Sequence, residues 1–172
     1  GRPFDGHAPR THVCSDLAYV RAGGSWCCVR LLVDLYSREI VGRSAGSSKG
    51  AKLVKAAFAT LEFPISDIEV SRTDRGSEFD NAEIGLMLEA FGIERSLSAK
   101  GCPYGNAADE STNKVLKAEL VYRDGFSDLR DLQAKLSDYV HWCNNFRIRS
   151  TLGYMSPVEF RKAGLILSKP SK

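Results

Sequence analysis

The fold is decided by the stretch THVCSDLAYVRAGGSWCCVRLLVDLYSREIVGRS, which spans residues 11–44. Polar and apolar residues alternate over residues 11–20, which predicts a strand with Asp16 near its middle. The run WCCVRLLVDLY at residues 26–36 is almost continuously apolar and is typical of a central strand that is buried on both faces. After the turn at Ser37 and Arg38, the pattern of residues 39–44 predicts a third strand. The stretch therefore predicts an antiparallel meander of three strands.

Helix and strand patterns alternate after the meander. The first predicted helix runs from a cap at Ser47 or Ser48 to about Glu62, and the second follows a cap at Asp80 or Asn81. Further helices are predicted at residues 106–122, 129–144 and 157–163, with short strands at 68–71 and 93–97. The order β-β-β-α-β-α-β-α-α resembles the ribonuclease H-like α/β fold, in which helices flank a mixed five-stranded sheet.

Length and composition favour one globular domain. The chain has 172 residues, of which 43% are hydrophobic and 26% charged. We expect a linker or arm at residues 1–10, a globular core at 11–165 and a disordered tail at 166–172. No apolar run approaches the roughly 18 residues that a membrane span needs, so we expect a cytosolic protein with reduced cysteines. The net charge of +3 permits a nucleic-acid partner without requiring one.

Three carboxylates stand in places that point to metal chemistry. Asp16 lies inside the first strand, Asp74 follows the fourth, and Glu110 lies in the first turn of a helix behind a glycine-rich loop. A charge in a buried strand is costly unless it is paired, and Mg²⁺ prefers carboxylate oxygens. Two ions clamped by these acids, with Asp16 as the bridge, suit in-line phosphoryl transfer. Taken singly, each acid also has a structural explanation. Asp16 would be a strand-edge residue that faces solvent, and Glu110 would be an ordinary first-turn acid that the helix dipole favours.

The motifs around these acids resemble those of insertion-sequence transposases, which are relatives of retroviral integrases. Thirty-five residues separate Asp74 from Glu110, as in the D-D-35-E signature of that superfamily. The matching segments, in chain order, are DLAYVR, VDLYSREIVG, TDRGSEF, KGCPYGNAADES, LKAEL and NNFRIRSTLGYMSPVEF. Val13 stands where the family usually has Trp, and Arg149 where it often has His, but neither change removes a predicted ligand.

The resemblance implies a ribonuclease H-like core that nicks the 3′ ends of a mobile element and joins them to target DNA. It implies two Mg²⁺ or Mn²⁺ ions on Asp16, Asp74 and Glu110, DNA as the partner, and a homo-oligomer in the bacterial cytosol. Two alternatives stay open. One is a ribonuclease H-like nuclease, and the other is a catalytically silent or domesticated remnant that still binds DNA.

Basic residues supply candidate DNA contacts. Lys114 and Lys117 project from the same helix face as Glu110, where they would contact phosphates or form a solvated Glu–Lys pair. Arg147 and Arg149, together with Asn144 and Asn145, form a cluster that is either a DNA contact or plainly solvated. Asp34, at the end of the second strand, is predicted to serve as a structural hydrogen-bond acceptor.

Overall fold

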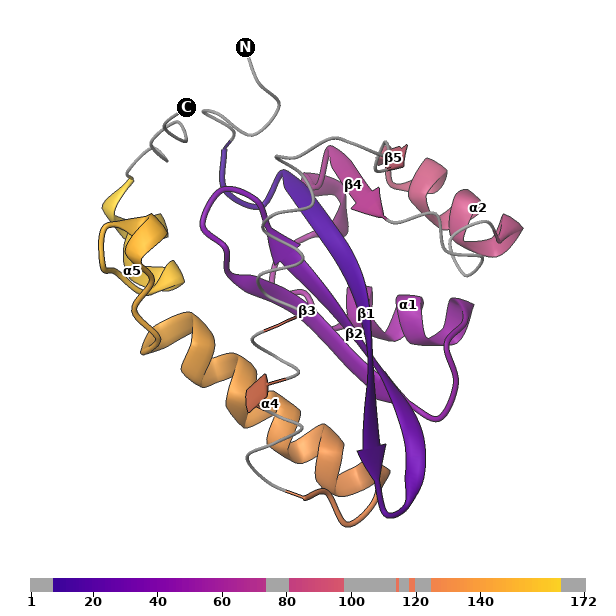
Figure 1. The fold of residues 1–172 in the computed structure, drawn as a ribbon. Helices are drawn as coiled ribbons and strands as arrows, with labels where there is room; N and C mark the ends of the chain where they lie inside the picture. The colour runs from indigo at the N-terminus through magenta and orange to yellow at the C-terminus, as the bar shows by residue number, and fades with distance from the viewer. Residues whose placement is uncertain (1–7, 74–80, 98–113, 115–117, 120–124, 165–172) are drawn as a thin grey trace.

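The predicted meander forms most of a five-stranded sheet in the computed structural model, which describes residues 8–73, 81–97, 114, 118–119 and 125–164 (Figure 1). Strands β1 (His12–Ala22), β2 (Ser25–Asp34) and β3 (Ile40–Gly46) pair antiparallel in sequence order. Gly23 and Gly24 make the β1–β2 turn, both with positive φ, as a type I′ hairpin requires. The close approach of Ser127 carbonyl oxygen leaves no room for a Cβ at Gly23.

Two parallel strands complete the sheet on the other side of β1. β4 (Val70–Thr73) pairs with β1, and β5 (Glu94–Leu97) pairs with β4. The strand order is β3-β2-β1-β4-β5, so the strand that carries Asp16 is central. This topology confirms the predicted mixed five-stranded sheet and places Asp16 on its most enclosed strand.

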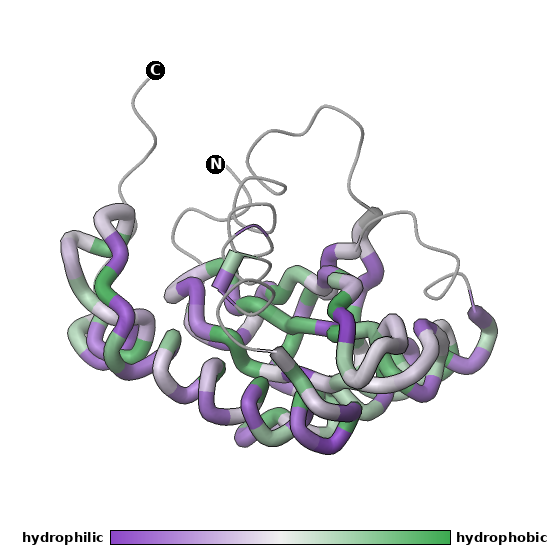
Figure 2. Tube along the Cα trace, turned by 60° about the horizontal axis from the view of Figure 1, so that its bottom comes forward, coloured by the Kyte–Doolittle hydropathy of each residue, from purple (hydrophilic) through white to green (hydrophobic). Residues whose placement is uncertain are grey.

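Helices cover both faces of the sheet. The helices α1 (Ala51–Ala59) and α2 (Ala82–Ala90) lie on one face, where they enclose one hydrophobic core with the strands. The helix α4 (Leu129–Asn145) crosses the other face and encloses a second core. Figure 2 shows the strands as the mainly green, hydrophobic centre, with purple hydrophilic stretches along the surrounding helices. The short elements are η1 (Ile65–Asp67), η3 (Ser150–Leu152) and α5 (Pro157–Ala163).

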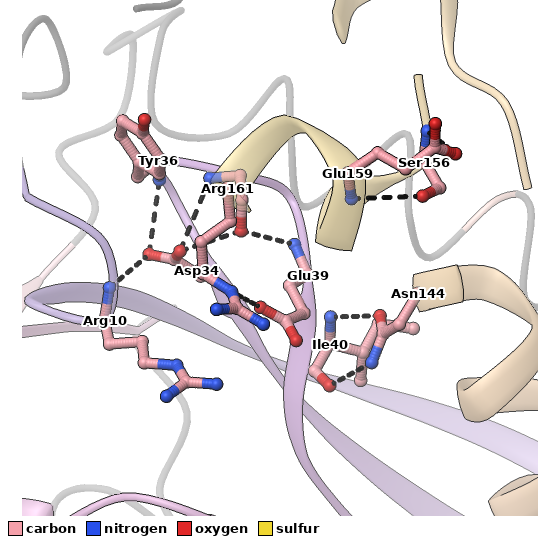
Figure 3. A network of polar contacts seen from close by, with 10 residues as sticks. Arg10, Asp34, Tyr36, Glu39, Ile40, Asn144, Ser156, Glu159 and Arg161 are labelled. Carbon is pink, nitrogen blue, oxygen red and sulfur yellow. Dashed lines mark hydrogen bonds and ion pairs between the residues drawn. The ribbon is translucent and has the colours of Figure 1, made fainter. Parts of the chain in front are cut away.

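Helix α4 is fixed to the sheet at both of its ends. The apolar stripe predicted for it is buried, and it consists of Leu132, Leu136, Tyr139, Val140 and Cys143. Near its start, Gly23 amide nitrogen donates a 2.8 Å hydrogen bond to Phe126 carbonyl oxygen. Near its end, the Asn144 side chain accepts from Ile40 nitrogen at 2.8 Å and donates to Ile40 oxygen at 2.9 Å (Figure 3).

The role of Asn144 in the structure differs from both interpretations based on the sequence, which were DNA contact and plain solvation. Its side chain is buried and satisfies the outward-facing peptide groups of Ile40 on the edge strand β3. An open strand edge favours pairing with other chains, so this contact also protects the edge. Asn144 therefore joins α4 to β3 and is neither solvated nor exposed for DNA.

Asp34 has the structural role that the sequence predicts. It is fully buried and accepts hydrogen bonds from the amide nitrogens of Arg10, Tyr36 and Ser37 and from the Ser37 hydroxyl (Figure 3). Burial raises the pKa of this carboxyl, and the hydrogen bonds oppose that rise. These bonds turn the backbone at residue 35, which is why β2 ends at Asp34 rather than at Tyr36.

The segment after α4 is anchored beside this turn. Ser156 and Glu159 form a capping box at the start of α5, and Arg161 of that helix pairs with Glu39 at 2.9 Å (Figure 3). Tyr36 packs against Phe160, with ring centroids 5.5 Å apart. Thus α5 begins and ends at the predicted residues and is tied to the β2–β3 turn.

Several predicted segments lie outside the described residues. They include most of the arm at 1–10, the tail at 166–172, and nearly all of the predicted helix at 106–122. Of that helix, Lys114 is α-helical and Glu119 belongs to a π-helical turn. No helix within the described ranges combines the length and apolar character needed to cross a bilayer.

Candidate active site

Asp16 lies on the face of the central strand that α4 covers. Side chains alternate along a strand, so Asp16 shares its face with Cys14 and Ala18, both buried. Its antiparallel partner on β2 is the buried Leu31. Asp16 itself is half-buried, and one carboxylate oxygen accepts a 2.8 Å hydrogen bond from Leu17 nitrogen. The structure thus places this acid among apolar side chains, on a strand held from both sides.

The β1–β4 register brings the two aspartate-bearing segments together. The two strands pair in parallel as far as Ser15 and Thr73, the residues that directly precede Asp16 and Asp74. Both Ser15 and Thr73 are buried. Asp74 lies outside the described residues, and so does Glu110. Of the predicted triad, the structure therefore locates Asp16 and the strand that leads directly to Asp74.

The described residues contain no group of three or more His, Cys, Asp or Glu side chains able to hold a metal ion. Two of the three predicted ligands fall outside the residues over which this search was made. The triad thus stays a prediction from the sequence.

The predicted DNA contacts divide into different environments. Lys114 is exposed and has no ion-pair partner within the described part of the chain, whereas Lys117 lies outside it. Arg147 forms an ion pair with Glu119 and stacks over the Trp142 ring, with its guanidinium carbon 5.6 Å from the centroid. Glu119 therefore already neutralises Arg147.

Arg149 is half-buried in a cationic environment. Burial is the main cause that lowers its pKa, and the charges of Arg38 and Arg147 lower it further. Within the residues that the structure describes, its guanidinium has no hydrogen-bond or ion-pair partner. Its backbone is nevertheless well held, since Arg149 nitrogen donates to Met155 oxygen at 3.1 Å.

Sequence reasoning missed the residues that surround Arg147. The Tyr139 hydroxyl and the Cys143 thiol lie in this cluster, and burial raises the pKa of both groups. Glu119 gave no separate signal because it is distant in sequence, and Tyr139 gave none because it belongs to the buried stripe of α4. A weak clue was available, since Tyr139, Cys143 and Arg147 are spaced four residues apart.

Comparison with known proteins decides between the families compatible with this fold. The family model described as integrase core domain matches residues 6–103, more than half of the chain. A second model with the same description matches residues 110–165. The chain belongs to the integrase core domain family. The first match includes Asp16 and Asp74, and the second begins at Glu110.

Curated relatives of this integrase core domain are transposases. A probable transposase for insertion sequence element IS1353 of Shigella flexneri is 32% identical over 97% of this chain and 33% of its own length. The transposase for IS904 of Lactococcus lactis is 32% identical over 92% of this chain and 64% of its own length. This integrase core domain thus spans about one to two thirds of the length of these relatives.

Solved structures confirm the fold. A chain of the simian T-cell lymphotropic virus intasome superposes with a TM-score of 0.74 at 15% identity, covering 98% of this chain and 60% of that one. The HTLV-2 integrase catalytic core domain in complex with magnesium superposes with a TM-score of 0.69 at 14% identity, covering 91% and 99%. These retroviral cores have the ribonuclease H-like fold, which is therefore the fold of this chain.

Proposed function

We propose that this integrase core domain is the catalytic part of a DNA transposase, a polynucleotidyl transferase that nicks element ends and joins them to target DNA. The observation that carries the proposal is the parallel register of β1 and β4, which pairs Ser15 with Thr73, the residues that directly precede Asp16 and Asp74 in the sequence. Neighbouring strands lie about 4.8 Å apart, so side chains on one face at this position suit shared ligation. The relatives described as transposases favour DNA joining over the ribonuclease H alternative.

The residues fit a divalent metal. Asp16 is half-buried, and the buried Cys14, Ala18 and Leu31 surround it on its face of the sheet. A divalent cation is one partner that lowers the cost of a carboxylate in such surroundings. Cys14 pairs with Arg72, so Arg72 lies on the face of the sheet that carries Asp16, and the proposed metal ligands are Asp16, Asp74 and Glu110. The donor set is then all carboxylate, which is the preference of Mg²⁺ and Mn²⁺.

In this proposal Asp16, Asp74 and Glu110 hold two ions. The bound ions would activate the attacking hydroxyl and stabilise the leaving oxygen of an in-line displacement. The chain's contribution is to hold its acids rigidly, since β1 is paired on both sides along the segment before Asp16. The magnesium named with the HTLV-2 core supports the choice of metal.

Phosphate positioning would fall to cationic side chains. We propose Lys114, Lys117 and Arg149 as phosphate contacts. Of the two predicted arginines, Arg149 is the stronger candidate, because Glu119 already pairs with Arg147. Arg147 would contact DNA only after that pair opens.

We further propose that the protein acts as a homo-oligomer on DNA in the bacterial cytosol. The HTLV-2 core is described in dimeric and trimeric forms, and the simian virus chain as part of an intasome. The limits of the arm at 1–10, the core at 11–165 and the tail at 166–172 are likewise proposals.

A strand-transfer and disintegration assay with Mn²⁺ tests the proposed function. Oligonucleotides copied from the ends of the encoding element serve as substrates. Glu110→Gln removes one charged ligand of one ion, and we expect the rate to fall about 100- to 1,000-fold, as for other groups that stabilise transition-state charge. Glu89→Gln, an exposed carboxylate on α2, is the matched control and should retain full activity. Equal rates for the unaltered chain and Glu110→Gln would refute the proposal.

A further inference from the structure

The segment that follows α4 exposes large apolar side chains between cations. Phe146, Ile148 and Tyr154 are 64%, 62% and 76% exposed. Single exposed apolar residues are ordinary, but here Phe146 and Ile148 alternate with Arg147 and Arg149, and Tyr154 follows within the same nine residues. We call Phe146, Arg147, Ile148, Arg149 and Tyr154 the aromatic–basic segment.

Tyr154 is held outward by an unusual backbone conformation. Its φ is 62°, in the left-handed region that bulky residues rarely adopt. Tyr154 nitrogen donates to Arg149 oxygen at 3.0 Å, which closes the loop, and the buried Leu152 anchors it. The ring gains no packing from this arrangement, because it is mostly exposed. Strain that presents a side chain to solvent is a reason to look for a function of that side chain.

Arg149 comes from the other end of the same closed loop and lacks an anion. Two other arginines of the segment after α4 are matched to acids, since Arg147 pairs with Glu119 and Arg161 pairs with Glu39. Within the described ranges no acid pairs with Arg149, while Arg38 and Arg147 add positive charge around it. A half-buried cation among cations favours an anionic partner from outside the molecule.

The loop is connected to the strand that carries Asp16. Leu152 packs with Tyr36 and Phe160 in one small cluster. Tyr36 nitrogen donates to Asp34, and Asp34 pairs with Val13 of β1, three residues before Asp16. These contacts connect the loop, through Tyr36 and Asp34, to the part of β1 that precedes Asp16.

We infer that Arg149 and Tyr154 together bind a DNA strand with an unpaired base, Arg149 through a backbone phosphate and Tyr154 by stacking its ring on the base. This inference rests on the proposed function and specifies the form of its substrate. A base can stack on an aromatic side chain only after it has left the duplex stack, and a neighbouring cation binds the backbone phosphate. A blunt duplex offers the phosphate but no free base face.

Fluorescence anisotropy in EDTA, where no reaction proceeds, tests the inference with two probes. One probe is a blunt duplex and the other is the same duplex with a short single-stranded overhang. We expect Tyr154→Ala to weaken binding of the overhang probe about 10-fold and to leave the blunt probe within about 2-fold. Tyr154→Phe should bind like the unaltered chain. Arg149→Ala should weaken both probes and reduce the slope of log K against log salt by about 1.

Two controls separate binding from folding. Tyr154→Gly accommodates the positive φ without strain, so its melting temperature should not fall although its overhang binding does. Tyr19→Ala removes another exposed ring, 46% exposed on β1, and should change neither probe.

Unchanged overhang binding in both Tyr154→Ala and Tyr154→Gly would overturn the inference. So would a shift in sedimentation toward a smaller species with unchanged DNA binding, because the surface would then serve a second copy of the chain. If either outcome is found while the unaltered chain still performs strand transfer, the proposed function is unaffected. If the unaltered chain binds the overhang probe through Tyr154 but shows no strand transfer, the result counts against the proposed catalysis alone.

Discussion

Asp16→Asn should abolish strand transfer, with a rate loss of at least about 10⁴-fold, equivalent to about 5.5 kcal/mol of transition-state stabilisation. Asp16 is the acid proposed to bridge both ions, so its loss weakens both sites, whereas Glu110→Gln weakens one. Asn keeps the size of the side chain and an oxygen that can accept the 2.8 Å hydrogen bond from Leu17 nitrogen. The fold should therefore be preserved, and the effect should be confined to chemistry and metal affinity.

Three measurements check this result. Strand-transfer rates with Mn²⁺ give the catalytic loss, calorimetric titration gives the loss of metal binding, and thermal unfolding gives the stability. Asp67→Asn, an exposed carboxylate in η1, is the control and should match the unaltered chain in all three. A large fall in the melting temperature of Asp16→Asn, with metal binding retained, would mean that Asp16 is a structural acid.

Asp34→Ala should lower the free energy of unfolding by about 3–5 kcal/mol. The carboxylate accepts from Tyr36 nitrogen, Ser37 nitrogen and the Ser37 hydroxyl, all buried, and from Arg10 nitrogen. Each buried donor left without a partner costs about 1–3 kcal/mol. Chemical denaturation measures the loss, and Asp67→Ala should stay within about 0.5 kcal/mol of the unaltered chain. A change below about 1 kcal/mol for Asp34→Ala would show that water replaces the carboxylate.

Comparison with Asp34→Asn adds a pH dependence with a defined sign. Burial raises the folded-state pKa of Asp34 above the ordinary value of about 3.9. The folded chain then binds more protons than the unfolded one between these two pKa values, so stability falls as pH rises through that window. Asn does not titrate. The stability of the unaltered chain relative to Asp34→Asn should therefore decrease from low pH upward, and a rise would contradict the burial effect.

The meander was predictable because its periodicity is strong, whereas its boundaries depend on contacts distant in sequence. The first helix shows this. It begins at Ala51 behind Gly50, with no side-chain cap, because β3 continues to Gly46 and leaves Ser47 and Ser48 in the connection. It ends at Ala59, earlier than expected, where the Thr60 hydroxyl accepts from Arg43 nitrogen on β3. By contrast, Asn81 caps α2 as expected, since that cap is local.

Only those features of the site that depend on residue identity and on order along the chain could be predicted from the sequence. The spacing of Asp16, Asp74 and Glu110 is a property of the sequence, and the triad stays a prediction, with β1 and β4 paired as far as the residues before the two aspartates. The pairing of Arg147 with Glu119 spans 28 residues, and no local pattern announces it. The isolation of Arg149 was equally invisible, because it depends on which acids the fold brings near.

Anomalous diffraction from crystals soaked in Mn²⁺ tests the two-ion site most directly. The account predicts two peaks about 3.5–4 Å apart, with the Asp16 carboxylate touching both, Asp74 on one and Glu110 on the other. Crystals of Asp16→Asn should show neither peak at full occupancy. The absence of any peak beside Asp16 in the unaltered chain, or a separation of the Asp16 and Asp74 carboxylates well over about 10 Å, would contradict the account.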